Sequence, residues 1–210
     1  MLTLIRRELY DNIIYALGSC TIGAMAISAM IYVSVYGTEL AKSTAAVIYP
    51  TLLLLPAFLT FSILGATQMY GDRANRISPL LSTLAVTRHH ILAARILAGI
   101  LTILLTTVPV LATATILLRV FLPPFEFYRR MVIEISVTAV LLGTACYSLG
   151  LLVGWTTSRT WLIVGTSLLL TVSASLIVIK GFGPEAMLFL VVFIAAVLVR
   201  TWHKFTSASL

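Results

Sequence analysis

The chain has 210 residues, of which 60% are hydrophobic and only 10% are charged, and its mean hydropathy is +1.08. Soluble domains carry about 25% charged and about 45–50% apolar residues, so a water-soluble fold of this length is excluded and we expect an integral membrane protein. The net charge of +7 does not indicate nucleic-acid binding, because no basic helix or RNA-binding signature accompanies it; loops facing the cytoplasm and anionic lipid account for it.

The N-terminal residues predict a helix that lies in the membrane surface before the first span. On a helix, Ile5 and Leu9 share an apolar face, whereas Arg7, Glu8 and Asp11 lie on the other. That pattern suits an interfacial helix. The alternative is that the first span begins early with a charged cap.

Long runs with few charges predict six membrane-spanning helices, because about 20 apolar residues cross a bilayer. We expect these spans at residues 13–36, 43–70, 96–118, 135–157, 160–179 and 182–199. Glu185 shortens the charge-free part of the last run, so a tilted or re-entrant segment is the alternative to a span there. No linker or shift in composition divides the chain, so residues 1–210 are expected to form one all-α, polytopic domain.

The distribution of Lys and Arg predicts that both termini are cytoplasmic. With six spans, nine of these residues fall on the side of the termini and the second and fourth loops, and five fall on the other side. Cytoplasmic loops carry an excess of Lys and Arg, which decides the orientation.

The segment between the second and third spans is unusually polar and predicts a short amphipathic helix. Ser78 and Pro79 form a helix-start signal, and Thr87 is a second cap before the third span. The apolar stripe of the short helix consists of Ile77, Leu80, Leu81 and Leu84. The charged residues around it include Asp72, Arg73, Arg76 and Arg88. Such a helix can lie on the membrane or dock into a groove of another protein; the alternative is a loop that only fixes topology.

This segment resembles the one that follows the second span in permease subunits of ABC-2 type transporters. In that family, charged residues are followed by Gly-Thr-Leu-Glu, a leucine-rich helix and Pro-[Val/Leu]-Ser-Arg. The corresponding residues here are 72–75, 76–79, 80–84 and 85–88. The chain departs from the pattern at Arg76, Pro79 and Ala85, where the family has Gly, Glu and Pro. The order of elements resembles the family over the whole chain.

The resemblance implies an exporter subunit in a prokaryotic cytoplasmic (inner) membrane. It implies a second permease copy, identical or related, and separate cytoplasmic ATPase subunits that bind ATP and Mg. It implies that Asp72, Arg73, Arg76, Leu80, Leu81, Leu84, Thr87 and Arg88 belong to a coupling helix that contacts the ATPase. It also implies that the interfacial helix, with Ile5, Arg6, Arg7 and Leu9, is an elbow helix. A haem-exporter-type permease is one variant, and a non-transport assembly or immunity subunit of a larger complex is the alternative.

We expect a non-catalytic chain without a cofactor of its own. No G-x-x-x-x-G-K-[S/T] motif is present, so ATP must be hydrolysed by a partner. The adjacent His89 and His90 point to different helix faces and make a poor metal chelate. Arg95 and Glu134 are expected at span edges, where a long side chain can reach the membrane surface. The lack of a central ionisable group disfavours a proton- or sodium-driven carrier.

Close helix contacts are predicted at the G-x-x-x-G motif formed by Gly150 and Gly154. Such a contact can lie within the chain or between two copies, and packing within the chain is the favoured interpretation. Cys20 and Cys146 both lie in apolar runs. We expect them to be small packing residues that form no disulfide or metal site.

Overall fold

The computed structural model describes residues 13–36, 55–70, 88–121, 125–154, 159–181 and 183–207, and these residues are helical apart from short turns. The helices are α2 (Ile13–Tyr36), a helix over residues 55–70, α5 (Arg88–Phe121), α6 (Phe125–Val153), α7 (Arg159–Lys180) and α8 (Pro184–Ser207). The described ranges contain no strand, so the all-α prediction is confirmed for them.

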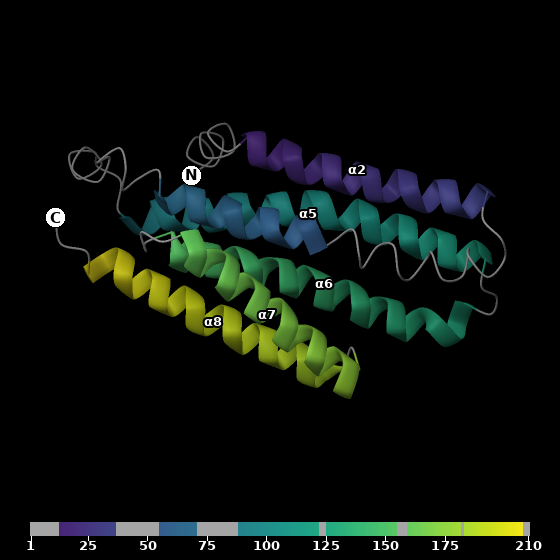
Figure 1. Ribbon diagram of the computed structural model, residues 1–210. Coiled ribbons are helices and arrows are strands. Elements are labelled where there is room, and N and C mark those ends of the chain that lie inside the picture. Colours follow the sequence, from purple (N-terminus) through teal and green to yellow (C-terminus); the bar gives the residue numbers. More distant parts are fainter. Residues whose placement is uncertain are drawn as a thin grey trace.

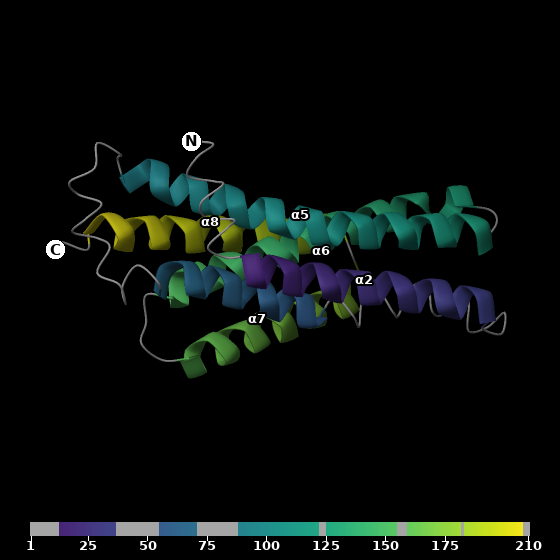
Figure 2. The same ribbon diagram turned by 90° about the horizontal axis from the view of Figure 1, so that it is seen from above.

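Successive helices run in opposite directions along one bundle (Figures 1 and 2). Tyr70, Arg88 and Val153 therefore lie at one end, which we call the proximal end. Tyr36 and Phe121 lie at the opposite, distal end. The distal ends of α2, α5 and α6 extend beyond the end that α7 shares with the start of α8 (Figure 1).

Four helices are long and apolar enough to cross a membrane, which supports an integral membrane protein. By length and composition these spans are Ile13–Val33, His90–Leu117, Arg129–Val153 and Pro184–Lys204. They include the sixth predicted span. In α7 the apolar part, Leu162–Ile177, is shorter, and only residues 55–70 of the second predicted span are described. The second and fifth spans therefore stay predictions.

Two helices begin well before the spans that were predicted for them. α5 begins at Arg88 rather than near residue 96, and α6 begins at Phe125 rather than near residue 135. The prediction ended each span at a charged residue, but a charged residue does not end a helix: α5 continues through Arg95, and α6 continues through Glu134. α6 also ends earlier than predicted, at Val153, where a turn at Gly154 follows.

α6 lies at the centre of the bundle. It packs most extensively against α8 and also contacts α5 and α7, while α2 packs against α5. The largest fully buried side chains include Met30, Phe61, Ile103, Tyr147, Leu151 and Leu190. Large apolar side chains such as Ile14, Leu105 and Leu168 are exposed on the outside of the bundle. An apolar exterior of this kind is suited to lipid.

Glycines bring the helix over residues 55–70 into backbone contact with α6. A Cβ atom on Gly150 would overlap the Ser62 carbonyl oxygen, and one on Gly65 would overlap the Tyr147 carbonyl oxygen. A Cβ on Gly154 would lie 2.6 Å from the Ala66 oxygen. The two glycines of the predicted motif thus pack against another helix of the same chain, where no larger residue fits without moving the backbone.

Candidate functional site: a buried polar junction of three helices

Most of the residues that the sequence assigns to a coupling role or an elbow lie outside the described residues. They are Ile5, Arg6, Arg7, Leu9, Asp72, Arg73, Arg76, Leu80, Leu81, Leu84 and Thr87. Arg88 is the first residue of α5. The described helix ends that border this segment are Tyr70 and Arg88, and both lie at the proximal end (Figure 1).

A buried polar junction lies near these two helix ends and is centred on Tyr147 of α6. The Tyr147 hydroxyl is 2.6 Å from Oε1 of Gln68, on the helix over residues 55–70, and 2.9 Å from the carbonyl oxygen of Arg95 on α5. Tyr147, Gln68 and Arg95 are only 1%, 6% and 4% exposed. Three helices therefore meet at one phenol, and we call these three residues with Met69 and Gly99 the Tyr147 junction.

Gly99 allows the phenol to reach the backbone of α5. In a helix, the carbonyl of Arg95 points toward the residue four positions later, which is Gly99. A Cβ atom on Gly99 would overlap the Tyr147 ring. The absence of a side chain at this position gives the ring a place to lie and gives its hydroxyl access to the Arg95 oxygen.

The proton count of the junction decides how its hydrogen bonds are made. A tyrosine hydroxyl has one proton and donates to one acceptor, but its oxygen can also accept. If the Gln68 amide turns its NH₂ group toward Tyr147, then Gln68 donates to the phenol oxygen and Tyr147 donates to the Arg95 carbonyl. In that arrangement both contacts are satisfied together, which matters because an unpaired polar group is costly in apolar surroundings.

The buried position of Arg95 corrects the prediction that its side chain reaches out to the membrane surface. The apolar helix His90–Leu117 contains Arg95, and the guanidinium Nη1 lies 3.8 Å from the Met69 sulfur. The prediction was wrong because it took the charge itself as the border of the span. Charged residues inside a membrane helix are rare and mark candidate functional positions.

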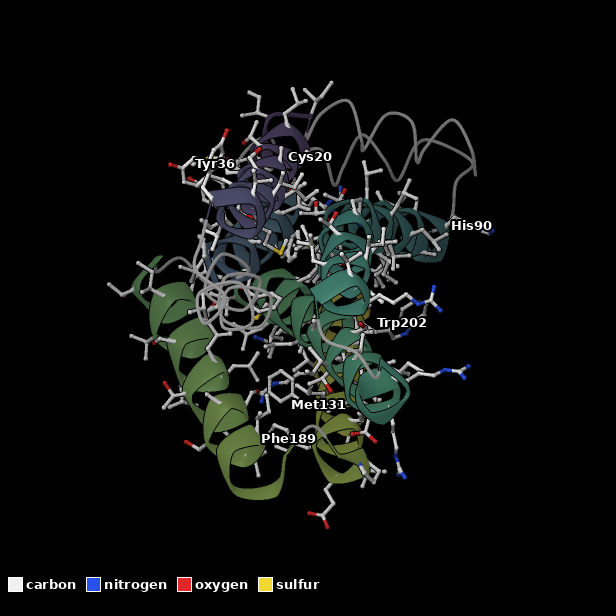
Figure 3. The ribbon with its side chains drawn as sticks, turned by 90° about the vertical axis from the view of Figure 1, so that its right-hand side faces the viewer. Cys20, Tyr36, His90, Met131, Phe189 and Trp202 are labelled. Carbon is white, nitrogen blue, oxygen red and sulfur yellow. The ribbon has the colours of Figure 1, made fainter. Side chains whose placement is uncertain are left out.

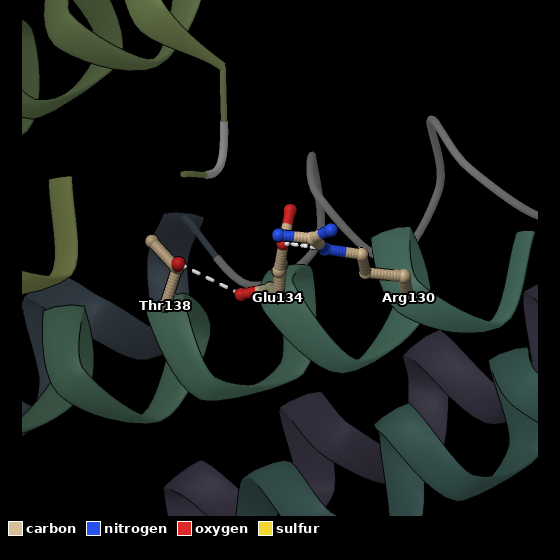
Figure 4. Close-up of polar contacts among 3 residues, drawn as sticks. All are labelled: Arg130, Glu134 and Thr138. Atoms are coloured by element: carbon tan, nitrogen blue, oxygen red, sulfur yellow. Dashed lines mark hydrogen bonds and ion pairs between the residues drawn. The ribbon is translucent and has the colours of Figure 1, made fainter. Parts of the chain in front are cut away.

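Glu134 lies inside the apolar helix Arg129–Val153, near its distal end. Its carboxylate Oε1 is 3.0 Å from the Arg130 Nε, and its carbonyl accepts a hydrogen bond of 2.8 Å from Thr138 (Figure 4). The side chains of Arg130 and Glu134 are 88% and 26% exposed. A pair so open to its surroundings stabilises a fold little.

Buried hydroxyl groups join further helices. Ser62 donates to the Cys146 carbonyl at 3.0 Å, and Thr166 of α7 lies 3.2 Å from the Ser62 hydroxyl. On the other side of the bundle, Thr106 of α5 lies 3.2 Å from Ser19 of α2. Thr106 and Thr166 also donate to the carbonyl four residues earlier, which is the ordinary use of threonine in an apolar helix.

The two cysteines are free thiols, and Cys146 is buried beside the junction. Cys20, on α2, is half-buried, and no disulfide joins it to Cys146. Within the described ranges, no three His, Cys, Asp or Glu side chains come together in a way that could hold a metal ion.

A small apolar groove of about 230 Å³ lies between α5 and α8 at the proximal end. The residues that line it are Leu92, Ile96, Leu198, Val199, Thr201 and Trp202. Trp202 and His90 lie on the same side of the bundle (Figure 3). The lining suits hydrocarbon and offers no charged group for chemistry.

Gln68 and Tyr147 were not singled out from the sequence. Tyr147 differs from most aromatic residues near predicted span ends because it lies well inside its span, and Gln68 is an amide in an otherwise apolar run. A buried tyrosine hydroxyl needs a polar partner. That requirement is the signal that could have paired them, although Arg95 takes part through its backbone, which no residue type reveals.

No protein-family model, no curated protein and no solved structure matches the chain.

Proposed function

We propose that the chain is the membrane subunit of an ABC-2 type exporter. Two permease subunits would form the export pathway, and separate cytoplasmic ATPase subunits would bind ATP and Mg and dock on segment 71–87. In this proposal the chain lies in a prokaryotic cytoplasmic membrane with both termini in the cytoplasm. A Walker motif is missing from the chain, so the energy of ATP must arrive through a partner.

The observation that carries the proposal is the segment between Tyr70 and Arg88. It holds the charged residues and the leucine stripe that resemble the coupling region of the family. The helices on either side of it belong to the packed bundle and share the Tyr147 junction. A segment held in this way by two packed helices is suited to pass a rigid-body movement from a soluble motor to the bundle.

The positions of the carboxylates also favour a motor-driven pathway over an ion-coupled carrier. Within the residues that the structure describes, the carboxylates are Glu126, Glu134 and Glu185, each in the distal half of its helix. Carriers driven by protons or sodium usually hold such groups near the membrane midplane. Arg95, although buried, is a guanidinium that keeps its proton in proteins and so cannot relay one.

Affinity purification from the native membrane tests the proposal. A tagged chain extracted in mild detergent should retain a protein with Walker motifs in stoichiometric amount, as identified by mass spectrometry. The purified complex should hydrolyse ATP. A chain that co-purifies with other membrane proteins but with no nucleotide-binding partner would contradict the proposal and favour an assembly or immunity subunit.

A further inference from the structure

Segment 71–87 is bordered on both sides by residues that meet at a single hydroxyl group. Gln68 lies just before the end of the helix over residues 55–70, and Arg95 lies about 10 Å along α5 from its start at Arg88. Tyr147 of α6 contacts both of them. The helix that leads into the segment and the helix that leaves it are therefore joined through one side chain of a third helix.

The contacts of Tyr147 fix the positions of whole helices, and not only of single side chains. The acceptor on α5 is the carbonyl oxygen of Arg95, which moves only with the helix itself. The Tyr147 ring is held against Gly99, so the phenol has little room to swing away. Because the junction is buried, water is not at hand to replace a broken bond, and its polar groups stay paired.

We infer that Tyr147 is a positioning residue whose hydroxyl, through Gln68 and the Arg95 carbonyl, sets the spacing of the two helices that border segment 71–87. α6 in turn packs against α5, α7 and α8, so Tyr147 holds the two bordering helices against the central helix of the bundle. That the spacing governs how the segment meets an ATPase rests on the proposed function. The spacing itself does not.

Pulsed electron–electron resonance on the full chain in lipid nanodiscs tests the inference. Spin labels are placed at Tyr70→Cys and Leu97→Cys, two exposed positions on the bordering helices, in a C20A/C146A background. A reference pair at Ile116→Cys and Leu188→Cys, also exposed, reports on α5 and α8 away from the junction. Y147F removes only the hydroxyl and keeps the ring on Gly99.

We expect Y147F to broaden the distance distribution of the 70–97 pair and to leave the 116–188 pair unchanged. Q68M, which removes the amide with little change in volume, should broaden the same distribution, and Q68M/Y147F should broaden it no further than either single variant. The matched control is T166V, which removes a buried hydroxyl of α7 that contacts Ser62 but keeps the Tyr147 hydroxyl and its two partners, and it should leave both pairs as in the parent.

An unchanged 70–97 distribution in Y147F would overturn the inference. Broadening of both pairs would overturn it as well, because it would mean a general loosening of the bundle. If an ATPase co-purifies with the chain, Y147F should lower the stoichiometry of the bound ATPase relative to T166V. Equal stoichiometry would mean that the helix spacing does not affect how segment 71–87 binds the ATPase. If no ATPase co-purifies with the parent, the proposed function fails, while the spin-label distances still decide whether Tyr147 sets the spacing.

Discussion

The Tyr147 ring of α6 lies against Gly99 of α5, one helical turn beyond the Arg95 carbonyl that its hydroxyl contacts. The aromatic ring of one helix thus packs directly on a glycine of the neighbouring helix. The contact joins the centre of the bundle to the helix that follows the most polar segment of the sequence.

Replacing Gly99 with alanine should destabilise the protein, because the added methyl group would overlap the buried Tyr147 ring. Overpacking of this kind costs about 1–3 kcal/mol. The measurement is the unfolding free energy in detergent by denaturant titration. The control is Gly18→Ala, where a Cβ meets no atom within 4 Å and the better helix propensity of alanine should leave stability equal or slightly higher. Equal stabilities for the two variants would contradict the packing of Tyr147 on Gly99.

Replacing Gly150 with alanine should push α6 away from the helix over residues 55–70, because the new Cβ would meet the backbone at Ser62. A backbone atom cannot turn aside as a flexible side chain can, so we expect a loss of at least about 1–3 kcal/mol and a lower thermal midpoint. Gly23→Ala is the matched control, since its nearest neighbour would lie at 3.4 Å. A thermal midpoint for G150A no lower than that of G23A would mean that the two helices are not in backbone contact.

Replacing Leu80, Leu81 and Leu84 with aspartate should abolish co-purification of the ATPase while the chain still inserts into the membrane. Buried apolar anchors hold a docked helix, and a carboxylate cannot enter an apolar groove without losing its hydration. The bound ATPase is quantified by mass spectrometry and insertion by membrane fractionation. The control, Ser82→Asp with Thr83→Asp, adds charge beside the stripe and should retain more of the partner. Full co-purification with the three aspartates in place would remove the docking role.

A cysteine at residue 88 should react with a membrane-impermeant maleimide only from the cytoplasmic side. Residue 88 begins α5 at the proximal end, whereas Arg129 lies near the start of α6 at the distal end and is exposed. In a background without Cys20 and Cys146, R88C and R129C should therefore label from opposite sides. Labelling of R88C from outside intact cells would reverse the predicted orientation, and labelling of both from one side would rule out α5 as a single span.

The bounds of a helix were predictable from sequence where the helix begins and ends with its charge-free run. α2 spans residues 13–36, the range expected from its apolar run. α5 and α6 were placed less well because Arg95 and Glu134 were taken as borders, whereas both continue a helix. A charged residue in an apolar run indicates that its side chain either has a polar partner or reaches the membrane surface. The sequence alone does not show which of these two applies.

The candidate site was only partly predictable, for a related reason. The motif of Gly150 and Gly154 announces a close helix contact, and the structure supplies its partner in the helix over residues 55–70. The Tyr147 junction depends on which faces of three helices meet, and one of its acceptors is a backbone oxygen. Contacts of this kind arise from tertiary packing, which a single sequence leaves open.

The unequal helices of the bundle bear on the membrane around it. The apolar helix His90–Leu117 of α5 has 28 residues and is about 42 Å long, whereas the apolar part of α7, Leu162–Ile177, is only about 24 Å long, against a hydrocarbon layer of about 30 Å. The α5 side of the molecule therefore matches a thicker bilayer than the α7 side. If α7 crosses the membrane, as the sequence predicts, the bilayer beside it must thin to match it, and the protein is expected to gather shorter-chained lipids along that flank.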